Sequence, residues 1–169
     1  MKRIVLLVVV LVIANQLNAQ GKYFTKSGKI NFDATSPSSP DKVMAVNKAA
    51  TCVLDTKTGD LQFSLLMRGF EFAKALMMEH FNENYIESSK FPKATFAGKI
   101  VNLTAINFSK DGSYAAKVKG KMTIHGETKE VDADGTITIK EGKISLSSLF
   151  TVTLADYKIS IPSVVADKV

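Results

Sequence analysis

The sequence has no tryptophan, one cysteine and two histidines among its 169 residues. A single thiol cannot form an internal disulfide, so a hydrophobic core has to stabilise the fold by itself. We expect that thiol, Cys52, to be a small core residue, because it alternates with Ala50 and Leu54. Two histidines without His-x-x-x-His or Cys-x-x-Cys spacing do not make a metal site, and we predict neither a metal nor a cofactor.

Motifs of catalysis and of nucleic-acid binding are also missing. The chain has no Gly-x-Ser-x-Gly elbow and no glycine-rich phosphate loop, so we predict no catalytic residues. The formal charge of +6 is a modest excess. Lys117, Lys119 and Lys121 alternate with apolar residues, as on the solvated face of a strand, which argues against a nucleic-acid partner.

The N-terminus reads as a signal peptide. Two basic residues precede an apolar run from Ile4 to Ala14, and a small-residue cleavage site ends at Ala19. The run is too short for a comfortable bilayer span, although an uncleaved anchor is the alternative. We therefore predict a signal peptide at 1–19, one domain at 20–169, and an exported protein, periplasmic or secreted, with no stable membrane span after cleavage.

The remaining chain is dominated by alternation of apolar and polar residues, which is typical of half-buried strands. Short turns such as Lys110-Asp111-Gly112 and His125-Gly126-Glu127 connect these segments, which favours antiparallel neighbours. Closure of such a meander into an up-and-down barrel removes exposed edges, and a sandwich is the competing fold. The predicted strands lie near 29–33, 43–55, 61–72, 94–100, 114–124, 131–139 and 144–154.

One stretch, Leu76 to Pro92, interrupts this pattern with helical spacing. Met77, Phe81 and Tyr85 fall on one side of the predicted helix, and Pro92 ends it. We expect a short helix laid against the mouth of the barrel. Its methionine and aromatic face would pack on the barrel and could also adapt to a flexible alkyl chain.

The inward positions of the strands mix aromatic and small residues. Small residues there, such as Gly98, Ala116 and Gly120, leave room for a long apolar ligand or mark sites of tight packing. The pattern alone leaves both interpretations open.

Three stretches carry a resemblance to a known family. They are residues 78–98, the run Gly120-Lys-Met-Thr-Ile-His-Gly-Glu-Thr-Lys129, and residues 156–162. Together they resemble the YceI-like family of exported bacterial proteins, over a length from about Gly28 to Pro162. The resemblance implies a lipocalin-like barrel of eight antiparallel strands that holds a long isoprenoid or similar amphiphilic lipid. Family members continue into a final long strand, and we expect this closing C-terminal strand to be absent here.

The combined prediction is an all-β, antiparallel, up-and-down barrel of about seven or eight strands with one inserted helix, acting as a lipid carrier rather than an enzyme. The alternatives are a cavity enzyme with His80 or His125 as acid–base group, and an interaction protein, including a homodimer, that pairs through open edges. The predicted ligand-binding residues are Phe63, Phe70, Phe72, Met77, Met78, Phe81, Tyr85, Phe96, Met122, Ile124 and Phe150.

Overall fold

The structure is a computed structural model that describes residues 21–35 and 42–160. The predicted signal peptide and the segment after Ser160, on which the prediction of an absent closing strand depends, lie outside the described residues. In chain order the elements are β1 (Lys22–Asp33), β2 (Met44–Asp55), β3 (Asp60–Leu66), η1 (Met67–Gly69), β4 (Glu71–Phe72), α2 (Ala75–His80), η2 (Phe81–Tyr85), β5 (Lys93–Ile100), η3 (Leu103–Ala105), β6 (Gly112–Ile124), β7 (Glu127–Lys140), β8 (Lys143–Ser148) and η4 (Leu154–Tyr157).

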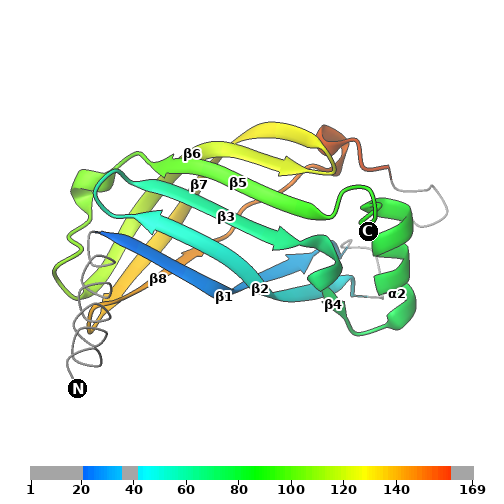
Figure 1. Cartoon of the computed structure of the whole chain (residues 1–169), viewed down its shortest axis with the longest axis horizontal. Helices are drawn as coiled ribbons and strands as arrows, with labels where there is room; N and C mark the ends of the chain where they lie inside the picture. The colour runs from blue at the N-terminus through cyan, green and yellow to red at the C-terminus, as the bar shows by residue number, and fades with distance from the viewer. Residues whose placement is uncertain (1–20, 36–41, 161–169) are drawn as a thin grey trace, which may run out of the picture.

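The strands form one antiparallel sheet in the order β1-β2-β3-β5-β6-β7-β8, with the two-residue β4 paired to β2. Figure 1 shows this sheet curling into a nearly closed barrel, with α2 at one end. The predicted meander with a single helical interruption is therefore confirmed. Among the described residues β1 pairs only with β2 and β8 only with β7, so a seam lies between β1 and β8.

The longest hairpin, β6 to β7, follows from its turn chemistry and its charges. His125 and Gly126 have φ angles of 51° and 78°, the left-handed values that a two-residue type I′ turn requires. In the resulting register the three predicted surface lysines face acids, and they are exposed as expected. The pairs are Lys117 with Asp134, Lys119 with Asp132, and Lys121 with Glu130.

The first strand is longer than the sequence pattern predicts. The pattern predicts a strand only from about residue 29, but β1 begins at Lys22. Two register shifts, on either side of Gly28, break the alternation that would have revealed the strand. A Cβ at Gly28 would lie 2.9 Å from the Ala50 carbonyl oxygen, so the bulge depends on a close backbone approach.

The last strand is shorter than predicted. Alternation from Ile144 to Leu154 predicts one continuous strand, whereas β8 ends at Ser148. Residues 149–153, called the strap below, have no regular secondary structure and lead to η4. This difference opens the wall of the barrel beside β7.

Two hydrophobic clusters fill the barrel, and the first lies towards the helical end. There Phe81 contacts Phe32, Phe70 and Phe72, with ring centroids 5.0–5.8 Å away. Phe81 is buried although no residue of α2 is, because it belongs to the π-helical turn that follows. The inserted helix therefore closes this end of the barrel mainly through one aromatic ring.

Candidate functional site

Most of the predicted ligand-binding residues lie inside the barrel, but they pack against one another. Eight of them belong to the two clusters, and Met77, Met78 and Phe150 belong to neither. Met78 is exposed on α2. The eight are Phe63, Phe70, Phe72, Phe81, Tyr85, Phe96, Met122 and Ile124.

The small interior residues at the centre of the sheet are sites of tight packing. Gly98 and Gly120 face each other across β5 and β6. A Cβ on either glycine would come within 2.6–2.7 Å of the ring of Phe96. That ring also stacks on Phe63, with centroids 5.2 Å apart. Of the two interpretations left open by the sequence, packing is the correct one at this position.

A hollow lies in the barrel wall of the described structure, between β7 and the strap. It has a volume of about 440 Å³, within the range of roughly 300–1,000 Å³ common for small-molecule sites. We call it the β7 groove. Its lining residues are Lys129, Glu130, Val131, Asp132, Ala133, Asp134, Leu149, Phe150, Thr151, Val152, Thr153, Asp156 and Tyr157.

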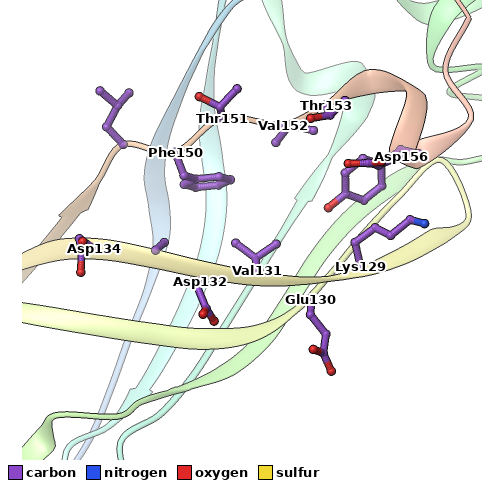
Figure 2. A pocket seen from close by; sticks show the side chains of 13 residues that line it. Lys129, Glu130, Val131, Asp132, Asp134, Phe150, Thr151, Val152, Thr153 and Asp156 are labelled. Carbon is purple, nitrogen blue, oxygen red and sulfur yellow. The ribbon is translucent and has the colours of Figure 1, made fainter.

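Three residues that line the β7 groove also take part in the packing of the barrel interior. Val152 packs against both hydrophobic clusters, Val131 against one, and buried Tyr157 belongs to the other. Figure 2 shows Val131 and Phe150 pointing towards each other across the gap, while Glu130 and Asp132 point away from the strap. An apolar chain lying in the groove would therefore touch core side chains.

The rim of the groove has both apolar and charged groups. Phe150 is 39 % exposed and lies in neither cluster, so part of its ring is uncovered. Lys129 and Asp156 line the groove at the η4 end. The Tyr157 phenol is uncharged at neutral pH, and burial raises its pKa further above the ordinary value of 10. This combination suits an amphiphile with a long apolar part and a small polar head.

The two histidines do not form a common site. His80 is exposed on α2, and its Nδ1 bonds to the Asn84 side chain at 2.9 Å. The His125 ring bonds instead to the backbone oxygen of Tyr157 and to the carboxylate of Glu87. Within the described ranges no group of three or more His, Cys, Asp or Glu residues is placed to hold a metal ion.

Sequence reasoning found one residue of the β7 groove, Phe150, and missed its partners. Val131 and Val152 are both on the inward side of their predicted strands, so the alternation contained a signal for them. The signal could not show that the strap leaves β7, because the pattern there remains that of a strand. Tyr157 was missed because it lies in a less regular closing segment.

A family comparison agrees with this architecture. The model of the YceI-like domain matches residues 10–169. The chain belongs to the YceI-like domain family. A search of curated protein sequences found no match for it. In the part of this YceI-like chain that the structure describes, no helix has the length and hydropathy needed to cross a membrane.

Solved structures share the fold at low sequence identity. A polyisoprenoid-binding domain from Saccharophagus degradans, implicated in plant cell wall breakdown, superimposes with a TM-score of 0.69 at 10 % identity, over 83 % of this chain and 82 % of that one. BcnA from Burkholderia cenocepacia gives 0.51 at 13 % identity, over 82 % and 74 %. A mutant YCEI protein of Campylobacter jejuni also gives 0.51, at 16 % identity, over 87 % and 78 %. These similarities confirm the barrel fold.

Proposed function

We propose that this protein is an exported carrier that holds a long-chain isoprenoid or similar amphiphilic lipid, with the apolar chain in the barrel and its access at the β7 groove. The observation that carries the proposal is a hollow of about 440 Å³ whose lining includes Val131, Val152 and Tyr157, which pack in or against the hydrophobic clusters. The neighbour from Saccharophagus degradans, described as polyisoprenoid-binding, supports the ligand class by analogy.

Burial of an apolar chain is enough to account for binding of this kind. Each methylene removed from water contributes ~0.8 kcal/mol, so a long chain needs few polar contacts. The aromatic residues predicted to bind ligand, Phe63, Phe70, Phe72, Phe81 and Phe96, lie in the two hydrophobic clusters and pack against their neighbours there. In our proposal they make room by changing rotamers, with Met122 and Ile124 beside them. Met77, Met78 and Tyr85 contribute from the helical end.

We infer binding rather than catalysis from the positions of the candidate acid–base groups. The His125 ring bonds to the Tyr157 backbone and to the Glu87 carboxylate, and the His80 ring bonds to the Asn84 amide on its own helical segment. Neither histidine lines the β7 groove. Export is part of the proposal on the basis of the basic and apolar N-terminal sequence.

Native mass spectrometry of protein purified without detergent tests the proposal. We expect a mass increment that organic extraction identifies as a lipid, and an increase in thermal stability when a polyprenol is added to stripped protein. A clean apo mass together with no thermal shift from polyprenols or fatty acids would rule the carrier function out.

A pair of variants locates the site. Phe150→Glu places a charge in the groove without removing a cluster residue, and we expect about tenfold weaker lipid binding because a buried charge is costly. Leu66→Glu is the matched control, since Leu66 is an exposed apolar residue on β3 that does not line the groove. Equal affinities for the two variants would place the lipid elsewhere.

Pairing through the open seam is the second candidate. Among the described residues the outer edges of β1 and β8 have no strand partner, and this favours pairing because unpaired strand edges accept another strand. The exposed Lys22, Lys26 and Lys29 on β1 act against it, since edge lysines repel a second copy. Light scattering over a range of protein concentrations tests this candidate. A molar mass that stays at the monomer value at all concentrations would rule the homodimer out.

A further inference from the structure

Along the groove, backbone N–H and C=O groups of β7 point in the direction from which a neighbouring strand would pair with them. Glu141 and Gly142 form a two-residue turn with φ angles of 51° and 73°, and Lys140 pairs with Lys143. From that closing pair, every second residue of β7 directs its backbone N–H and C=O towards β8. Asp134 follows this rule, because its carbonyl oxygen accepts a hydrogen bond of 2.7 Å from the Ser148 hydroxyl.

The same alternation places the backbone groups of Asp132 and Glu130 in the groove. The last residue pair between β7 and β8 is Gly135 with Ser148. Beyond it, residues 149–152 of the strap make no hydrogen bond to β7 in the described part of the chain. Asp132 and Glu130 therefore present two backbone donors and two acceptors in the groove that have no strand partner among the described residues.

The strap carries a sequence that fits this edge in register. If the pairing of Gly135 with Ser148 continued without a shift, Ala133 would face Phe150 and Val131 would face Val152. All four side chains would then point inward, as the alternation along β7 and β8 requires. The partly exposed ring of Phe150 would be covered.

Contacts to β7 fix the chain just before and just after the strap, where a continued strand would begin and end. Before the strap, the Ser148 hydroxyl donates a hydrogen bond to the backbone oxygen of Asp134. Beyond its end, the Lys158 ammonium lies 2.7 Å from the Glu127 carboxylate. The continued register would bring Leu154 opposite Lys129, two residues from Glu127, so η4 could stay in place. In Figure 1 the coil after β8 runs to η4 beside the hairpin of β6 and β7.

We propose that the β7 groove is a lateral portal through which a long isoprenoid or acyl chain reaches the barrel interior, and that the strap closes this portal by extending β8 along β7. The inference rests on the proposed function, since it assigns the route of that ligand. The described structure is the open state. The closed state completes the strand that the sequence pattern predicts over 144–154.

Cysteine trapping tests the movement without any ligand. In a Cys52→Ala background, Val131→Cys with Val152→Cys joins residues that face each other only in the closed state. Thr136→Cys with Ser147→Cys is the control for oxidation between β7 and β8, because these residues are already paired. We expect both pairs to oxidise readily, since facing residues in adjacent strands have Cα separations of about 4.5–5.5 Å that suit a disulfide.

Uptake of an anthranilate ester of farnesol then tests the portal. Oxidation of the Val131/Val152 cysteine pair is expected to slow uptake by about tenfold, because the gate must open before the ligand passes, and reduction restores it. The oxidised Thr136/Ser147 control keeps the rate of the parent. If the first pair does not fold, Ala133→Cys with Phe150→Cys replaces it in the same register.

The outcomes separate the two proposals. Failure of the strap cysteines to oxidise under conditions that fully oxidise the control pair would overturn strap closure. If the strap disulfide formed but the uptake rate of the farnesyl probe did not change, the β7 groove would not be the route by which the ligand enters. A parent protein that binds no farnesyl probe would contradict the carrier function, while the trapping step would still decide whether the strap extends β8.

Discussion

His125 and Glu87 lie 38 residues apart, yet the imidazole Nε2 is 3.0 Å from the carboxylate Oε2 of Glu87. The other ring nitrogen, Nδ1, is 3.1 Å from the backbone oxygen of Tyr157. Both ring nitrogens therefore face oxygen atoms, one from a carboxylate and one from the backbone. The Phe91 ring covers the imidazole with a centroid distance of 4.3 Å. One side chain thus joins the segment after the helix, the β6–β7 turn and η4.

The first prediction concerns this junction. Asn tolerates the left-handed φ of 51° at position 125 but cannot reach both acceptors, so His125→Asn should lower the free energy of unfolding by about 1–3 kcal/mol. Urea denaturation followed by far-UV circular dichroism measures the change. His80→Asn is the control, and its exposed site predicts a change below about 0.5 kcal/mol. Similar losses in the two variants would mean that the junction contributes no special stability.

The sequence was sufficient to predict the barrel because its strongest signals are local. The alternation over 114–124 and the turn at His125-Gly126 appear in the structure as β6 and its hairpin. Register shifts, in contrast, depend on how a strand pairs with its neighbour, and the sequence of one strand does not show them. The two shifts beside Gly28 concealed half of β1, since alternation reports a strand only where its pairing is regular.

The site was less predictable than the fold. Alternation correctly placed residues such as Phe96 and Met122 inside, but it could not distinguish a filled interior from a hollow one. The difference depends on how side chains from separate strands meet, as Phe96 does with Gly98 and Gly120. The β7 groove was invisible for a related reason, because residues 149–153 have the composition of a strand and leave the sheet nonetheless.

The second prediction tests this tight packing. In Gly120→Ala the added Cβ would lie 2.5 Å from the Ala97 carbonyl oxygen and 2.7 Å from the Phe96 ring. Backbone and ring must both shift, so we expect a loss of about 1–3 kcal/mol in unfolding free energy. Gly142→Ala is a useful contrast, because a Cβ at Gly142 meets nothing within 4 Å and only the φ of 73° opposes it. An unchanged urea midpoint for Gly120→Ala would show that this part of the interior is looser than described.

The third prediction uses the single thiol. Cys52 is half-buried against the second cluster, and burial raises the pKa of its thiol. Because the thiolate is the reactive form, native protein should react with iodoacetamide more slowly than denatured protein at the same pH. Mass spectrometry of samples quenched over time measures both rates. Equally fast alkylation in the two states would contradict the placement of Cys52 in the core.

The last prediction concerns the anchor of the strap in acid. The hydrogen bond from Lys158 is the main cause that lowers the pKa of Glu127 below its ordinary value of 4.5. A lowered carboxyl pKa contributes stability that is complete above the ordinary value and is lost as the pH falls through the folded-state value. We therefore expect the ion pair between Lys158 and Glu127 to persist at neutral pH and to break only below pH 4.5.

Carboxyl NMR titration measures this effect. In Lys158→Met the titration midpoint of Glu127 should rise towards its ordinary value. Lys48→Met, which removes the exposed pair with Glu71, should leave that midpoint where it is in the parent. If the Glu127 midpoint were the same in Lys158→Met as in the parent, this ion pair would not be the contact that holds η4 and the end of the strap in place.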